Sequence, residues 1–173
     1  DLNSLKLTED WLTVCAQASA DSVGLQMHED DFFFFVNPGK NKICAFYTKM
    51  LDSNQKVKNQ FETKLVSAVS MADRDMPLDI VIVIFYENAE LSLLKISYDN
   101  SDNVKVTGWG IHQSDQDTIT HILEDKIRKD ITFESKPLER NHDCYEKIFE
   151  LFCSHEILEK DKRVLLELIP KEN

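Results

Sequence analysis

The sequence has little glycine and proline and no long apolar segment, and each shortage excludes a class of structure. Four glycines and four prolines among 173 residues argue against long linkers and disordered tracts. The longest apolar run, 80–86, is far shorter than the roughly 20 residues that a membrane-spanning helix needs. The chain also lacks an initiating Met and a signal-peptide pattern, so we expect a processed fragment with no membrane association.

Short motifs of common enzyme classes are missing as well. The sequence contains no P-loop, no dinucleotide-binding glycine pattern, no G-x-S-x-G, no H-E-x-x-H and no pair of C-x-x-C motifs. These motifs place phosphates, nucleophiles or metals, so their absence weakens the prediction of an enzyme in general.

Positive charge is scarce: 20 Lys and Arg stand against 31 Asp and Glu, which gives a net charge of −11 and a pI of about 4.9. Binding to nucleic acid depends on cationic side chains that displace counterions from phosphates. The charge therefore disfavours nucleic acid and anionic membranes as partners, and mildly favours a basic protein.

The four cysteines do not form a recognisable framework. Cys15, Cys44, Cys144 and Cys153 are scattered through apolar surroundings. We expect buried, reduced thiols, which are typical of an intracellular protein of the cytoplasm or nucleus.

Apolar spacing predicts several amphipathic helices. One begins near Thr8, and the clearest runs from Lys56 to Asp75, where Pro77 follows. Ser114 with Asp117 resembles a capping box and predicts a helix to about Lys129. Two C-terminal helices are expected, one beginning near 141 and one covering about 160–169.

Other segments predict strands. Residues 78–86, 91–98 and 104–111 are joined by connections of hairpin length and should form an antiparallel meander. Shorter strands are expected at 25–27 and 131–133. Residues 32–36 and 42–50 flank an Asn-Pro-Gly-Lys turn and predict a hairpin. Four consecutive phenylalanines, 32–35, place aromatic rings on both faces, which indicates a central strand of a covered sheet.

Together these elements predict an α+β fold, an α/β sandwich. We expect a mixed, largely antiparallel sheet of about five to six strands, with the long helix packed on it and C-terminal helices. The chain, 1–173, should be a single globular domain with a core at about 8–130 and a helical extension at about 138–170.

Carboxylates at the entrance of the hairpin provide the first candidate site. Asp30 and Asp31 precede its first strand, and Lys49 ends its second. The element order of about 8–97 resembles the restriction-endonuclease-like (PD-(D/E)XK-type) nuclease core. The resemblance implies that Asp30 or Asp31 binds Mg²⁺ or Mn²⁺ and that Asp31 and Lys49 are catalytic. Tyr47 stands where that family has an acid or amide, which removes a ligand and implies a degenerate site.

The same order also resembles roadblock and longin-type modules, from the first helix to about 129. That resemblance implies a domain that forms dimers or binds GTPase regulators and has no catalytic residues. It stands beside the nuclease-like alternative.

Three weaker candidates follow from single motifs, and each has a structural explanation. His142 and Cys144, with Cys153 and His155, have zinc-binding side chains, but residues two apart on a helix diverge, which favours core thiols and surface imidazoles. The second group, Asp117, His121 and Glu124, shares one helical face, where solvated polar residues are common.

The third motif is Thr107-Gly108-Trp109-Gly110. Its glycines would allow a partner's backbone to approach or mark a strand bulge, and an exposed Trp109 is the best candidate for partner binding.

The leading hypothesis is a non-catalytic protein–protein interaction domain, a subunit or adaptor of an intracellular assembly, without cofactor or metal. It is expected to bind a protein partner or to form a homo-oligomer. The alternative is the degenerate metal-dependent nuclease domain.

Overall fold

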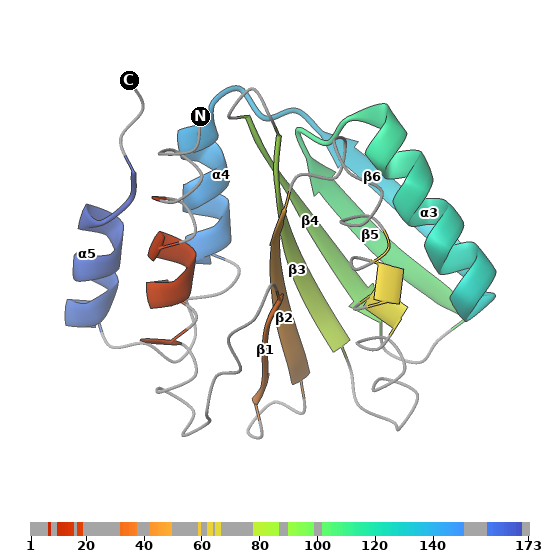
Figure 1. Cartoon of the computed structure of the whole chain (residues 1–173), viewed down its shortest axis with the longest axis horizontal. Helices are drawn as coiled ribbons and strands as arrows, with labels where there is room; N and C mark the ends of the chain where they lie inside the picture. Colours follow the sequence, from red (N-terminus) through yellow and green to blue (C-terminus); the bar gives the residue numbers. More distant parts are fainter. Residues whose placement is uncertain are drawn as a thin grey trace.

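Six β-strands form one mixed sheet with helices on both faces in the computed structural model of the chain (Figure 1). The structure describes residues 7, 10–15, 17–18, 32–37, 42–49, 59, 62–63, 65–66, 78–86, 90–98, 102–150 and 159–170. The α+β class predicted from the sequence is therefore confirmed.

The strands lie in the sheet in the order in which they occur along the chain. Neighbouring strands are antiparallel except for β2 with β3 and β5 with β6, which are parallel. The bounds are β1 Phe32–Asn37, β2 Lys42–Lys49, β3 Leu78–Phe85, β4 Leu91–Tyr98, β5 Asn103–Trp109 and β6 Asp130–Lys136. The predicted hairpin (β1 and β2) and the predicted meander (β3, β4 and β5) are both confirmed.

Strand β3 is the interior strand on which the core is built. Its residues Ile80 to Ile84 are all buried, so both faces of the strand are covered. Val81 and Val83 join one apolar cluster, so the even-numbered side chains of β3, which alternate with them, point to the opposite face of the sheet. A continuous β-branched run is what a strand covered on both faces requires.

The four phenylalanines lie elsewhere than predicted. Their strand, β1, is at the end of the strand order and pairs with β2 alone among the described strands. The central position predicted for this strand is not found among the described strands, and the strand expected at 25–27 lies outside them. Apolar residues on both faces indicate that the faces are covered. They carry no information on how many strands lie alongside.

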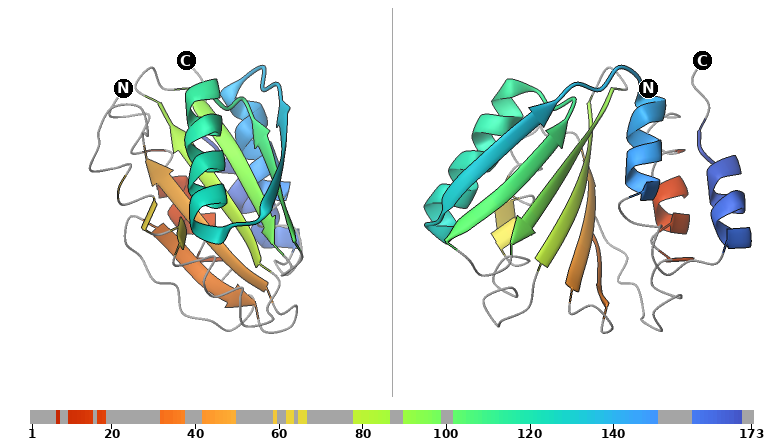
Figure 2. Two further views of the ribbon diagram at one scale, coloured as in Figure 1. Left: turned by 90° about the vertical axis from the view of Figure 1, so that its right-hand side faces the viewer. Right: turned by 180° about the vertical axis from the view of Figure 1, so that it is seen from behind.

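Different helices lie on the two faces of the sheet (Figures 1 and 2). Helix α3 (Gln113–Ile127) connects the parallel strands β5 and β6 and packs on one face. Helices α4 (Asn141–Ile148) and α5 (Glu159–Glu167), with the N-terminal helical residues 10–15, lie on the other face. Within the described residues, no helix has the length and apolarity needed to cross a membrane.

The start of α3 differs from the predicted capping box. His112, in place of Ser114, is the N-cap, and its side chain makes no capping hydrogen bond. Its carbonyl accepts the N–H groups of Asp115 and Gln116. The helix therefore begins earlier than predicted, and the Asp115 carboxylate in its first turn is available to bind a group outside the helix.

The helical layer is held by an aromatic contact and one long-range hydrogen bond. The indole Nε1 of Trp11 donates to the Leu165 carbonyl at 3.0 Å, and the Trp11 and Tyr145 rings meet edge to face with centroids 5.2 Å apart. Trp11, Tyr145 and Leu165 are all buried in the cluster beneath. These contacts join the N-terminal helical residues to both α4 and α5.

Two predicted elements stay predictions. The strand expected at 25–27 lies outside the described residues. Of the long helix expected from Lys56 to Asp75, the structure describes 59, 62–63 and 65–66, which are helical, and Leu65 is buried.

Candidate functional site

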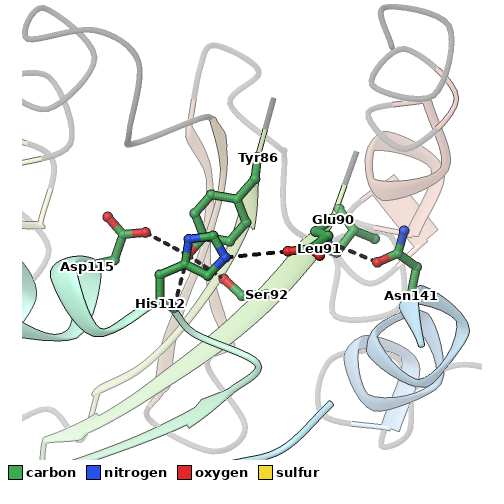
Figure 3. A network of polar contacts seen from close by, with 7 residues as sticks. All are labelled: Tyr86, Glu90, Leu91, Ser92, His112, Asp115 and Asn141. Atoms are coloured by element: carbon green, nitrogen blue, oxygen red, sulfur yellow. Dashed lines mark hydrogen bonds and ion pairs between the residues drawn. The ribbon is translucent and has the colours of Figure 1, made fainter. Parts of the chain in front are cut away.

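Polar side chains converge at the sheet edge where β3 ends, β4 begins and α3 begins (Figure 3). Tyr86 is at the centre: its hydroxyl donates to Asp115 Oδ2 at 2.6 Å. The Tyr86 hydroxyl oxygen also accepts hydrogen bonds from the Ser92 hydroxyl and from the His112 backbone N–H, both at 3.4 Å. Tyr86, Ser92 and Asp115 are each at most 3% exposed. We call Tyr86, Glu90, Ser92, His112 and Asp115 the Tyr86 network.

Local structure fixes the position of each group. The Tyr86 N–H donates to the Glu90 carbonyl at 2.9 Å, which closes the turn between β3 and β4. Asp115 lies in the first turn of α3, where the helix dipole stabilises a carboxylate. The backbone N–H of Leu91, the first residue of β4, donates to the side-chain carbonyl of Asn141 at 3.0 Å. One corner of the sheet is thus connected to both α3 and α4.

The surroundings of Tyr86 keep its hydroxyl group protonated. Burial, and next the hydrogen bond to Asp115, raise the pKa of Tyr86 well above its usual value of 10.0. The phenol therefore stays protonated and acts as a hydrogen-bond donor to the carboxylate. A group of this kind stabilises a corner of a fold and has no tendency to lose its proton at neutral pH.

Only the outer part of the network is open to solvent. The His112 imidazole stacks on the Tyr86 ring with centroids 3.8 Å apart and planes at 8°. Its Nε2 lies 3.4 Å from Glu90 Oε2, and both side chains are exposed. Ser92, by contrast, is fully buried and offers no accessible nucleophile.

The carboxylates predicted for the nuclease-like site, Asp30 and Asp31, lie outside the described residues. Lys49 is the last residue of β2, opposite Ile84 of β3, and the structure describes its backbone only. Tyr47 pairs with Phe32 across the hairpin. The parallel pairing of β2 with β3 is the strand arrangement that this alternative requires, whereas the distance from Asp31 to Lys49 stays untested.

The predicted His/Cys group does not assemble among the described residues. Cys144 is buried at the start of α4, and burial raises the pKa of its thiol far above 9.0. His142 lies on the surface of the same helix, with Nε2 3.2 Å from Glu146 Oε1. Cys153 and His155 lie outside the described residues. Cys144 is therefore a packed thiol, because thiolate character requires a lowered pKa.

The acidic face of α3 is solvated. Asp117, His121 and Glu124 are exposed, and Asp117 accepts a hydrogen bond from the Gln113 side chain at 2.9 Å. In the part of the chain that the structure describes, no three His, Cys, Asp or Glu side chains are placed to hold a metal ion.

Trp109 ends β5 and is partly buried against the apolar cluster. The ammonium groups of Lys136 and Lys147 lie 5.9 and 5.7 Å from its ring centroid, within cation–π range. Its role in partner binding stays a prediction.

The glycines beside Trp109 serve packing within the chain. A Cβ on Gly108 would meet Ile111 at 2.9 Å and Phe133 at 3.2 Å, and one on Gly110, at φ +67°, would meet Leu138 at 2.7 Å. The close approach predicted for a partner or ligand is made by these neighbouring side chains.

Sequence reasoning missed Tyr86, Ser92 and Asp115. A Tyr at the end of an apolar strand and an Asp in the first turn of a helix are individually common. The only sequence signal was local, namely an acidic residue next to a helix start. The pairing itself depends on how α3 docks on the sheet.

Comparison with known proteins shows no family. No family model and no curated protein matches the sequence. Among solved structures, the chain is similar to a crystal structure of the Legionella pneumophila effector protein RavZ. That match has 11% identity and a TM-score of 0.44, and it covers 74% of this chain and 48% of the RavZ chain.

Proposed function

We propose that this chain is a non-catalytic protein–protein interaction domain, a subunit or adaptor of a larger assembly. One observation carries the proposal, which is the exposure of large apolar side chains on α5 and beside it. Val164, Leu166 and Leu168 are 54, 43 and 52% exposed, although Leu165 between them is buried. Isolated exposed apolar residues are ordinary, but a group of them on one element is typical of a binding surface.

The apolar arc of α5 and the residues after it is wider than its contact with the core cluster requires. At about 100° per residue, Val164, Leu165 and Leu166 span roughly 200° around the axis of α5, and Leu168 and Ile169 follow directly after its end. Leu165 and Ile169 face the core cluster, and the others flank that contact on both sides. A helix with one packing partner needs an apolar stripe of about 100°. The additional width fits a second partner.

The N-terminal helical residues extend this surface. Leu7 and Val14 are also exposed, and they lie four and three residues from Trp11, at helical spacing. Trp11 itself is hydrogen-bonded to Leu165 of α5. Leu7, Val14, Val164, Leu166 and Leu168 are thus exposed apolar residues of the two segments that this hydrogen bond joins, and we call them the α5 apolar surface.

We expect the occupant to be an amphipathic helix of a partner protein that carries net positive charge. An apolar helix face matches exposed Leu and Val side chains. The net charge of −11 would attract a basic partner over long range. The non-catalytic part of the proposal is supported by the burial of Ser92, Tyr86 and Cys144, which keeps their hydroxyl and thiol groups from a substrate.

Affinity capture with matched variants tests the proposal. The purified chain is used as bait in extracts of the cells that express it, alongside Leu168→Lys and the neighbouring Glu167→Lys. We expect a protein that wild type and Glu167→Lys retain and Leu168→Lys does not, and that binds the purified chain directly. The proposal fails if Leu168→Lys retains the same proteins as wild type while folding normally.

A metal-dependent nuclease-like domain is the second proposal, supported by the parallel pairing of β2 with β3. Asp30 and Asp31 would hold Mg²⁺ or Mn²⁺, with Lys49 nearby. If the site binds metal, millimolar Mn²⁺ raises the melting temperature, and Asp31→Ala removes the increase. No increase with either ion would exclude an active site of this kind.

A further inference from the structure

Strand β6 leaves one side of the sheet open. It pairs with β5, and no other strand of the described part of the chain lies on its outer side. Figure 2 shows β6 at the far side of the sheet from α4 and α5. An open edge presents unpaired N–H and C=O groups and is a template for pairing with another strand.

The hydrogen bonds to β5 determine which backbone groups point outward. Asp130 N–H donates to the Asp102 carbonyl, and the Lys136 carbonyl accepts from Gly110. Even-numbered residues of β6 therefore direct their backbone groups toward β5. Because these directions alternate along a strand, Ile131, Phe133 and Ser135 direct theirs to the open edge. The next odd position is Pro137, which has no N–H and ends the row of donors.

The sequence of this edge complements itself. Read as an antiparallel pair about Phe133, the segment Asp-Ile-Thr-Phe-Glu-Ser-Lys places Asp130 opposite Lys136 of a second copy, and the reverse. Thr132 then lies opposite Glu134. We propose that a second copy of this chain adds to the sheet at β6 in this register and forms a symmetric dimer with one continuous sheet.

Backbone and side-chain requirements agree on the same register. With Phe133 opposite Phe133 of the second copy, the outward groups of Ile131, Phe133 and Ser135 all meet partners, in about six hydrogen bonds. Asp130 and Lys136 then occupy positions without direct backbone bonds, where opposed side chains are closest. Asp130 and Lys136 are exposed, so neither needs to leave a buried position.

Two features keep this association weak. The net charge of −11 on each copy opposes dimerisation, and a seven-residue edge is a small contact. The Asp130–Lys136 pairs offset the repulsion at the contact itself. Lys136 also has Glu134 at 3.8 Å on its own strand, so the dimer would extend an existing ion pair.

Sedimentation of the whole chain over a range of concentrations up to about millimolar tests this proposal, because edge contacts of this size are weak. We expect a monomer–dimer equilibrium that Ser135→Pro abolishes. That change removes an outward N–H and leaves the ladder to β5 intact. Circular dichroism confirms that the variant folds.

Charge exchange tests the register. Asp130→Lys and Lys136→Asp each place like charges together twice, so each should raise the dimer dissociation constant about tenfold or more. The double variant Asp130→Lys/Lys136→Asp restores opposite charges and should recover dimerisation. Glu167→Lys, on α5, matches the charge change of Asp130→Lys and should not weaken the dimer.

Three results would overturn the proposal: a monomer at every concentration, a dimer that Ser135→Pro leaves unchanged, or a double exchange no better than the singles. Leu168→Lys separates this inference from the proposed function. It removes the α5 apolar surface and should leave the β6 dimer intact. A dimer lost in Leu168→Lys and retained in Ser135→Pro would place self-association at α5.

Discussion

Replacing Tyr86 with Phe tests whether the Tyr86 network stabilises the fold. The change removes one oxygen and leaves the ring stacked on His112. The lost bond to the Asp115 carboxylate is short, at 2.6 Å, and buried. A hydrogen bond to a charged group contributes about 1.5–3 kcal/mol. The two 3.4 Å contacts from Ser92 and His112 are long and add little.

We therefore expect Tyr86→Phe to lower the free energy of unfolding by about 2–3 kcal/mol, or roughly 5–10 °C in melting temperature. Urea unfolding followed by circular dichroism measures it, with an unchanged m-value as evidence that the folded state is comparable. Asp115→Ala and the double variant complete a mutant cycle, in which the coupling energy should reach about 1.5 kcal/mol or more. A cost below about 0.5 kcal/mol, or no coupling, would refute the reasoning.

The network also has a pH signature whose sign follows from the raised pKa of Tyr86. A pKa raised in the folded state means that the stabilisation is fully present below the unfolded value of about 10. It is lost as pH rises above that value, at up to about 1.4 kcal/mol per pH unit. Wild type should therefore lose stability above pH 10 more steeply than Tyr86→Phe. Parallel curves would contradict the assignment.

Two further predictions concern the core. The buried thiol of Cys144 should resist a thiol reagent such as DTNB in the folded chain, and rapid labelling of the native protein would contradict this. Because burial raises the pKa of Cys144 in the folded state, wild type should also lose stability above about pH 8.5 more steeply than Cys144→Ala. The difference should reach up to about 1.4 kcal/mol per pH unit. Gly108→Ala should cost about 1–3 kcal/mol in urea unfolding, because its Cβ would press on Ile111 and Phe133; an unchanged midpoint would contradict the close packing.

Sequence periodicity identified the elements whose pattern is local. The run from Ile80 to Ile84 is apolar on both faces and forms an interior strand, and short connections correctly indicated the meander of β3, β4 and β5. The Asn-Pro-Gly-Lys turn correctly indicated the hairpin. In each case the signal lies in a strand and the short connection next to it in the sequence.

Features that depend on docking were not predictable. The four phenylalanines do not reveal that β1 is at the end of the strand order. Ser114 resembled an N-cap, yet His112 is the N-cap of α3, and Asp115 in its first turn accepts the Tyr86 hydroxyl. The α5 apolar surface was equally hidden, since Val164, Leu165 and Leu166 look alike until the position of Trp11 shows which one is covered.

Titration of the purified partner into the purified chain tests the central claim most directly. Leu168 is about half exposed, and its burial against a partner is worth about 1 kcal/mol, with a similar cost for placing a Lys there. Leu168→Lys should therefore weaken binding roughly 30-fold, whereas Glu167→Lys, about 100° around the helix axis from Leu168, should change it less than about threefold. Equal affinities for wild type and Leu168→Lys would contradict the assignment of α5 as the docking surface.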